Sequence, residues 1–182
     1  MEKLQIAVFG GGCFWCTEAI FDELKGVESV TSGYAGGGME SPRYEDVSSG
    51  QTGHAEVIKI EFDPNQISYR DLLTVFFATH DPTTPNQQGS DVGTQYRSII
   101  LYTDENQRLE AEAFIEELNN STSEGDEIVT EIKPLDKFYP AEDYHQDYYA
   151  NNSNKPYCQI VINPKLQKLQ EKFGDLLKNE TK

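Results

Sequence analysis

The chain has 182 residues, of which 31 are acidic and 15 are lysine or arginine, giving a formal net charge of −16. This length fits one domain, residues 1–182, and the acidity disfavours nucleic acid because phosphates repel a negative surface. No apolar run reaches the roughly 20 residues of a membrane span, and three cysteines do not form a secreted disulfide framework. The first residues lead directly into strand-like sequence without a signal peptide, so we expect a cytoplasmic location. We also expect a monomer.

The first six predicted elements follow the order β-α-β-β-α-β. Apolar periodicity and turn residues place them at residues 4–9, 13–24, 27–35 and 54–62, in a helix that opens at Ser68, and at 97–102. This order suits a ferredoxin-like sheet, a split β-α-β arrangement packed on helices. We therefore predict an α+β fold, a two-layer sandwich with a C-terminal extension.

The remaining segments are more polar. A long loop at 80–95 is rich in Pro, Thr, Asn and Gly, and loops of this length in compact domains are often functional. The pattern then predicts a helix at 104–118, a strand at 127–132, a short helix within 138–149, a strand at 157–162 and an amphipathic helix at 165–178. The last residues, 179–182, are expected to fray.

The stretch Gly10-Gly11-Gly12-Cys13-Phe14-Trp15-Cys16 joins the first strand to the first helix. Glycines allow a tight turn, and a helix N-terminus favours an anion such as a thiolate. We therefore predict that Cys13 is a nucleophile with a lowered pKa, rather than a small buried apolar residue. Cβ atoms one helical turn apart lie about 5–6 Å from each other, whereas a disulfide needs roughly 3.8 Å. A bond between Cys13 and Cys16 would thus be reversible.

Two further features of the sequence predict an acid in an apolar pocket. Alternation along 54–62 places Glu56 on one strand face with Ile58, Ile60 and Phe62, where partial burial would raise the pKa of its carboxyl. The opposing interpretation, a solvated glutamate at the start of the strand, stays open at this point. Trp15, beside the reactive thiol, is expected to line a substrate pocket, whereas for Phe14 a core position is as plausible.

Tyr34, Asp91 and Tyr96 occupy glycine-rich or polar loops, and with ten tyrosines in the chain the simplest role of any one of them is packing. Cys158 shares a predicted strand face with Ile160, which favours a buried structural thiol. Because Cys158 and three histidines are scattered along the chain, no metal site is predicted.

Several motifs resemble those of the A-type peptide methionine sulfoxide reductases, in the family's order and over nearly the whole chain. They are Gly11-Gly12-Cys13-Phe14-Trp15-Cys16, Gly33-Tyr34-Ala35-Gly36-Gly37, Thr52-Gly53-His54-Ala55-Glu56-Val57, His80-Asp81-Pro82-Thr83-Thr84, Gly93-Thr94-Gln95-Tyr96-Arg97-Ser98 and Ala141-Glu142-Asp143-Tyr144-His145-Gln146. The resemblance implies an enzyme that reduces methionine S-sulfoxide, free or in proteins, and supports the layered α+β core.

The resemblance also implies roles for individual residues. The Cys13 thiolate attacks the sulfoxide sulfur, protonated Glu56 donates to the oxygen, and Tyr34 and Tyr96 donate hydrogen bonds to that oxygen. Asp91 contacts the substrate or positions water.

Phe14 and Trp15 resemble the apolar pocket for the substrate's methyl group. Methionine leaves and Cys13 becomes a sulfenic acid, after which a second thiol forms a disulfide that thioredoxin reduces. No resident cofactor is implied. Members with Cys-Phe-Trp-Cys are expected to use the second cysteine, so we assign Cys16, and a disulfide in a Cys16→Ser variant would indicate Cys158 instead.

Two other functions fit parts of the sequence. A Cys-x-x-Cys after a strand is also typical of thioredoxin-like thiol–disulfide oxidoreductases, although the glycine lead-in and the Phe-Trp pair count against that class. A non-catalytic module could bind methionine-like side chains through an aromatic pocket. Thiols left unchanged after mixing with methionine sulfoxide would favour such a module.

Overall fold

The computed structural model describes residues 3–121 and 125–178, so the predicted frayed end at 179–182 lies outside the described residues. Within them a six-stranded sheet has the order β7-β6-β1-β3-β2-β8. Its strands are β1 (Gln5–Gly10), β2 (Val27–Ala35), β3 (Ala55–Phe62), β6 (Ile99–Tyr102), β7 (Glu131–Pro134) and β8 (Phe138–Pro140). Neighbouring strands are antiparallel except for the parallel pair β6 and β7. The α+β class predicted from the sequence is therefore confirmed.

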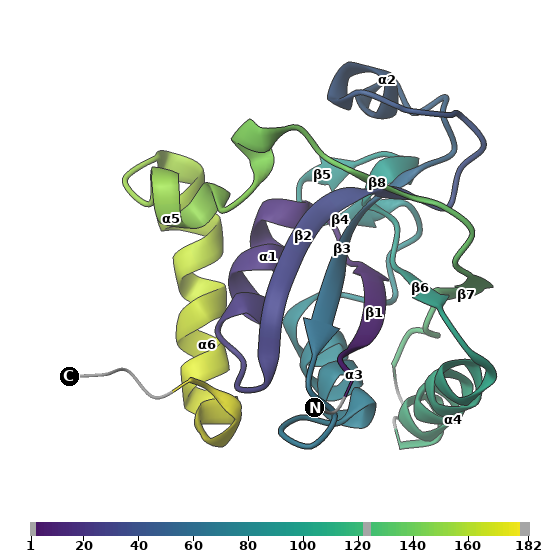
Figure 1. The fold of residues 1–182 in the computed structure, drawn as a ribbon, viewed down its shortest axis with the longest axis vertical. Coiled ribbons are helices and arrows are strands. Elements are labelled where there is room, and N and C mark those ends of the chain that lie inside the picture. Colours follow the sequence, from purple (N-terminus) through teal and green to yellow (C-terminus); the bar gives the residue numbers. More distant parts are fainter. Residues whose placement is uncertain (1–2, 122–124, 179–182) are drawn as a thin grey trace.

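The helices pack mainly on one face of this sheet. They are α1 (Phe14–Asp22), α2 (Tyr44–Ser48), α3 (Tyr69–Thr79), α4 (Glu105–Ser121), α5 (Tyr148–Asn152) and α6 (Asn163–Phe173). Apolar side chains of α1, α3, α4 and α6 share one core cluster with alternate residues of β1 and β3. Figure 1 shows α6 alongside α1 at one side of the sheet and α4 at the other.

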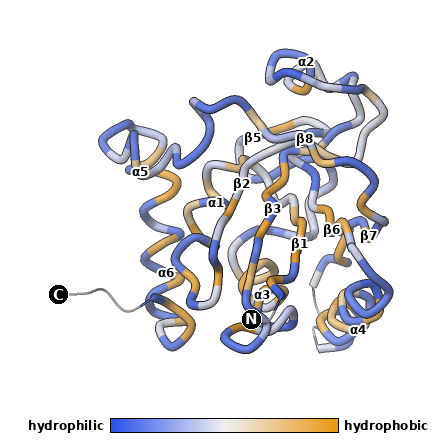
Figure 2. The backbone as a smooth tube through the Cα atoms, viewed as in Figure 1, coloured by the Kyte–Doolittle hydropathy of each residue, from blue (hydrophilic) through white to orange (hydrophobic). Residues whose placement is uncertain are grey.

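The predicted strand alternation explains this core. Ile58, Ile60 and Phe62 are fully buried and belong to the helix-facing cluster, whereas Val57 belongs to a second cluster on the other face. In Figure 2 the apolar colouring follows β1 and β3, whereas hydrophilic and hydrophobic residues alternate along α4. No helix of the described residues is both long enough and apolar enough to span a bilayer.

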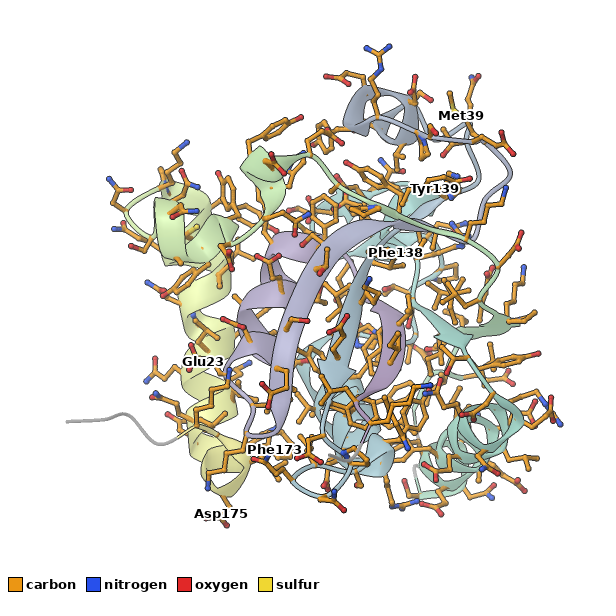
Figure 3. The ribbon with its side chains drawn as sticks, in the orientation of Figure 1. Glu23, Met39, Phe138, Tyr139, Phe173 and Asp175 are labelled. Carbon is orange, nitrogen blue, oxygen red and sulfur yellow. The ribbon has the colours of Figure 1, made fainter. Side chains whose placement is uncertain are left out.

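The C-terminal extension is attached to the end of α1. Lys25 N donates to Leu176 O at 2.8 Å, and Lys178 N donates to Glu23 O at 2.8 Å. Figure 3 labels Glu23 on this side, with Phe173 and Asp175 near the end of α6. At the opposite end of the sheet it labels Phe138 and Tyr139 on β8, which pairs with the end of β2. The extension thus holds α6 against the helix that carries the cysteine pair.

Three local predictions need correction. The strand predicted at 157–162 is wrong, because Cys158–Ile162 forms a π-helical turn that leads into α6. Cys158 and Ile162 are buried but Ile160 is 73% exposed, and burial at every fourth residue is a helical period, not a strand period. The short helix predicted within 138–149 consists of β8, a 3-10 turn at Asp143–His145 and the start of α5. The predicted strand at 127–132 begins only at Glu131.

The polar loop at 80–95 has structure of its own. It contains a two-stranded hairpin of β4 (Gln87–Gln88) and β5 (Asp91–Val92), followed by a 3-10 turn at Thr94–Tyr96. Arg97 holds this turn in place by donating to Thr94 O and Gly53 O, both at 2.9 Å. The loop therefore lies beside the start of β3, at the end of the sheet where β1 also ends.

Candidate active site

The glycine stretch sets the position of Cys13. Gly10 ends β1 where a Cβ would lie 2.9 Å from Glu56 O, and Gly12 has a φ of +98° that side chains rarely adopt. Cys13 is the N-cap of α1, with an extended backbone, and Cys16 N donates to Cys13 O at 3.1 Å. The chain thus places Cys13 at the helix N-terminus, as the sequence predicts, and Cys16 one turn into the helix.

A cavity of about 240 Å³ opens at this helix end. Its lining residues come from five separate segments and are Cys13, Phe14, Trp15, Tyr44, Glu56, Asp91, Tyr96 and Tyr157. The structure therefore brings together most of the residues predicted from the sequence. Cys16 and Tyr34 are the two predicted site residues that do not line this cavity.

Glu56 is a buried carboxyl in the cavity wall. It is only 3% exposed, and its Oε1 accepts a hydrogen bond from Phe14 N at 3.1 Å. Burial raises the pKa of Glu56 to about 8; the Phe14 hydrogen bond opposes this rise, and the charge of Asp91 adds to it. The alternative of a solvated glutamate at the strand start is thereby excluded. At neutral pH the cavity holds a protonated carboxylic acid.

The two thiols of Cys13 and Cys16 form a coupled pair. Their mutual hydrogen bond, together with burial and the charge of Glu56, raises the pKa of Cys13 well above its ordinary range. The same hydrogen bond lowers the pKa of Cys16 to about 7, with help from the charge of Lys165 and the Tyr157 hydroxyl. The predicted low pKa at Cys13 is therefore wrong for the resting site. The pair loses its first proton near neutrality, and Cys13 then donates to the Cys16 thiolate.

One of the two tyrosines predicted for the site does not line the cavity. Tyr34 is fully buried, and its hydroxyl donates to Glu142 Oε1 at 3.1 Å, away from the cavity lining. Tyr44, at the start of α2, lines the cavity instead. Its backbone N–H donates to Glu142 Oε2 at 3.3 Å, so one carboxylate anchors both tyrosines. No local sequence pattern indicates that Tyr44 belongs to the site. Its position depends on tertiary contacts such as the one with Glu142.

Tyr157 is a second lining residue that sequence reasoning missed. Its hydroxyl lies 3.4 Å from Cys16 Sγ and donates to Asp91 Oδ2, also at 3.4 Å. The misassigned strand at 157–162 hid this position, since the helical turn directs Tyr157 and Cys158 differently from a strand. Asp91 and Tyr96, both predicted, are half-buried in the cavity wall.

The aromatic wall is held by its own hydrogen bonds and stacking. Trp15 Nε1 donates to His145 Nδ1 at 3.0 Å, and the Trp15 ring stacks on Tyr148 with centroids 3.7 Å apart. Phe14 is 1% exposed, yet it both packs in the core and lines the cavity. Burial lowers the pKa of His145, which keeps the ring neutral and able to accept from Trp15. These contacts fix the orientation of the indole at the cavity.

The third cysteine, Cys158, is fully buried in a cluster with Cys16, Ala19 and Ile162. The predicted buried thiol is confirmed, although it lies on a helical turn. Among the described residues no group of three or more His, Cys, Asp or Glu side chains could hold a metal ion.

Comparisons with known proteins show which family the whole chain resembles. Residues 5–177 match the family model described as peptide methionine sulfoxide reductase. The peptide methionine sulfoxide reductase MsrA of Acinetobacter baumannii (strain AYE) is 56% identical over 176 residues, 97% of this chain and 100% of that protein. Reduced Mxr1 of Saccharomyces cerevisiae superposes with a TM-score of 0.78 at 36% identity, covering 86% of this chain and 90% of that one. Mxr1 in complex with Trx2 superposes with a TM-score of 0.56 at 28% identity, covering 80% and 85%.

Proposed function

The chain belongs to the peptide methionine sulfoxide reductase family, and from this premise we propose that the cavity at the start of α1 performs the family's chemistry. The protein is an oxidoreductase that reduces methionine sulfoxide to methionine, using a thioredoxin as its reductant. The S epimer, free or within proteins, is the proposed substrate. The residues that carry the reaction are proposals drawn from the geometry above.

Phe14 and Trp15 form the proposed apolar pocket for the methyl group of the substrate. Both rings line the cavity, and the hydrogen bond to His145 holds the indole in place. The sulfoxide oxygen would accept hydrogen bonds from Tyr44 and Tyr96, which are neutral because burial raises the pKa of both phenols. We assign to Tyr44 the role that the family resemblance gave to Tyr34.

Cys13 is the proposed nucleophile and Glu56 the proposed acid. As the substrate binds, the proton of Cys13 passes along the existing hydrogen bond to Cys16, which leaves the thiolate at Cys13. This thiolate attacks the sulfoxide sulfur while Glu56 protonates the oxygen. Methionine leaves with its thioether restored, and Cys13 carries the oxygen as a sulfenic acid.

Cys16 is the proposed resolving thiol. It attacks the Cys13 sulfur, a disulfide forms and the oxygen leaves as water. The thiols of the N-cap and the third helical residue shift each other's pKa, so they lie close together, and this supports closure of a disulfide between them. Cys158 remains the alternative, because it packs against Cys16 in the same cluster. A thioredoxin would reduce the disulfide, and the Mxr1–Trx2 complex supports this class of partner.

The observation that carries the mechanism is that Glu56, a carboxyl buried at 3% exposure, lines the same cavity as Cys13. The test is a single turnover with excess methionine S-sulfoxide and no reductant. One methionine per chain and the loss of two thiols are expected. Thiols that stay intact would favour a methionine-binding module, and reduction of insulin disulfides without sulfoxide reduction would favour a thioredoxin-like enzyme.

Further proposals concern the chain as a whole. The order β6-β1-β3-β2, with all three pairings antiparallel, supports a ferredoxin-like split β-α-β core. We also propose that the chain is a single domain and a monomer. We further propose that it has no prosthetic group, since the electrons enter through a dithiol protein. A cytoplasmic location is supported by the need of the cysteine pair for a reducing partner.

A further inference from the structure

The two cysteines of the pair differ in their access to solvent. Cys13 is half-buried and lines the cavity. Cys16 is only 2% exposed, does not line the cavity and packs with Ala19, Cys158 and Ile162 under the rings of nearby tyrosines. Only one sulfur of the proposed disulfide is therefore reachable from outside through the cavity.

Disulfide exchange requires the attacking sulfur to approach one sulfur of the bond while the other leaves. A thiolate that attacked Cys16 would have to enter the cluster formed by Ala19, Cys158 and Ile162. A thiolate that attacks Cys13 approaches through the cavity, whose lining includes the half-buried rings of Trp15 and Tyr44. The N-cap position also favours attack on Cys13, because the extended backbone at Cys13 precedes the helix, whereas Cys16 lies within it.

We propose that the reductant, a dithiol protein of the thioredoxin class, enters through the substrate cavity and attacks Cys13, with Cys16 as the leaving thiolate. This inference rests on the proposed function. The bond between the two chain sulfurs breaks, and a mixed disulfide forms between Cys13 and the reductant. The second thiol of the reductant then attacks its own sulfur in that mixed disulfide, which releases Cys13 as a thiolate and leaves the reductant oxidised.

The surroundings of Cys16 suit a leaving group. The Tyr157 hydroxyl lies 3.4 Å from Cys16 Sγ and also 3.4 Å from Asp91 Oδ2, so it can turn its single proton from the carboxylate to the thiolate as the bond breaks. Lys165, half-buried on α6, adds a positive charge that lowers the pKa of the Cys16 thiol. Thiols of lower pKa leave faster in disulfide exchange. The same groups that give Cys16 its low pKa thus favour its departure during regeneration.

The shared entrance makes product and reductant competitors. Methionine that still occupies the pocket of Phe14 and Trp15 would block the approach to Cys13. The product must therefore leave before the reductant can act. A reductant that attacked Cys16 or Cys158 from another side would not be affected in this way.

The experiment begins with the full chain oxidised by one turnover with methionine S-sulfoxide. No loss of thiols at this stage would contradict the proposed function itself. The oxidised chain is then mixed with a thioredoxin whose second active-site cysteine is replaced by serine, and the mixed disulfide is located by tandem mass spectrometry. We expect the adduct on Cys13, in the native chain and in the Cys158→Ser chain. An adduct on Cys16 or Cys158, or none on Cys13, overturns the inference.

A second measurement uses the only tryptophan of the chain, Trp15, whose fluorescence reports binding of N-acetylmethionine amide to the oxidised protein. At a concentration that fills about nine-tenths of the cavities, reduction by native thioredoxin should slow about tenfold, because only the free fraction reacts. Reduction of insulin by the same thioredoxin serves as the control and should be unaffected. An unchanged rate, or no binding to the oxidised cavity, refutes a shared entrance.

Discussion

Replacing Glu56 with glutamine tests the proposed acid directly. The amide keeps the size of the carboxyl and can still accept the hydrogen bond from Phe14 N. It cannot give up a proton to the departing oxygen. We expect Glu56→Gln to lower kcat/KM at neutral pH by about 100- to 10,000-fold, the usual contribution of a positioned general acid.

The pKa values of the site predict the shape of the pH profile. With a pKa of about 8, about nine-tenths of the Glu56 carboxyls are protonated near pH 7, whereas an ordinary carboxyl would be protonated in roughly one molecule of 300. The cysteine pair loses its first proton near 7. The rate should therefore rise with pH through about 7, peak between 7 and 8, and fall above about 8. In Glu56→Gln the falling limb should disappear and the rising limb should remain.

Stability supplies an independent check on the same group. The pKa of Glu56 is raised by folding, from 4.5 to about 8, so its stabilising contribution is fully present below 4.5 and is lost as pH rises through about 8. Over that interval the Glu56→Gln variant should lose less unfolding free energy than the native chain, by roughly 5 kcal/mol at most. Denaturant unfolding at pH 5 and pH 9 measures the difference.

Glu18→Gln is the matched control. Glu18 is also a buried carboxyl, 4% exposed, and burial raises its pKa to about 7, but it accepts from Ser32 Oγ and does not line the cavity. This variant should alter the pH dependence of stability and leave the falling limb of activity in place. If Glu56→Gln retains native activity with both limbs, or if Glu18→Gln loses the falling limb, the assignment of the acid is refuted.

Five further variants, at four positions, separate the remaining roles. Cys16→Ser should release one methionine per chain but form no internal disulfide, because the resolving thiol is gone; thiol titration and mass spectrometry of the single turnover measure this. Tyr44→Phe should lower kcat/KM about tenfold, because it removes one hydrogen bond to the sulfoxide oxygen, and steady-state kinetics measures this. Tyr34→Phe should reduce the free energy of unfolding by about 1–3 kcal/mol, measured by denaturant unfolding, with little effect on the rate. His145→Phe should raise KM more than it lowers kcat, because Trp15 loses its acceptor, and His145→Gln, which retains an acceptor, should largely restore KM in the same assay.

Each of these results has a clear opposite. An internal disulfide in the Cys16→Ser chain would assign the resolving role to Cys158. A larger rate loss in Tyr34→Phe than in Tyr44→Phe would show that the buried phenol acts on the substrate. Equal KM values in His145→Phe and the native chain would show that the indole needs no anchor.

Local patterns explain why much of the fold could be predicted. The strand predicted at 27–35 matches β2, and the helix predicted to open at Ser68 has its capping box, with Asp71 N donating to Ser68 Oγ at 3.0 Å. Both depend on interactions within a few residues. The strand prediction at 157–162 was wrong because the apolar spacing of Cys158–Ile162 fits a strand as well as a helix. Packing against α1 decides between them, and that packing leaves no local trace.

The same division holds for the site. Cys13, Phe14 and Trp15 are adjacent in sequence, and strand alternation predicted the burial of Glu56, so these lining residues could be found without the structure. Tyr44, at the start of α2, and Tyr157, at the start of the helical turn before α6, are distant in sequence and are held by contacts with Glu142 and Asp91. The sign of the Cys13 pKa shift was missed for a related reason. The helix N-terminus favours a thiolate at Cys13, but the interaction between the two thiols lowers the pKa of Cys16 instead and raises that of Cys13.

The charges of the cavity are coupled in a way that suits a reductase. Ionised Cys16 and Asp91 both raise the pKa of Glu56, and a charged Glu56 in turn raises the pKa of Cys13. The favoured resting state therefore has one negative charge on the cysteine pair and a neutral acid. Because both charges would be confined to the same poorly solvated cavity, ionising the second group costs more than ionising the first. Burial thus keeps the Glu56 carboxyl protonated, while the interaction between the two thiols lets the cysteine pair lose a proton, and both hold over the same narrow pH range.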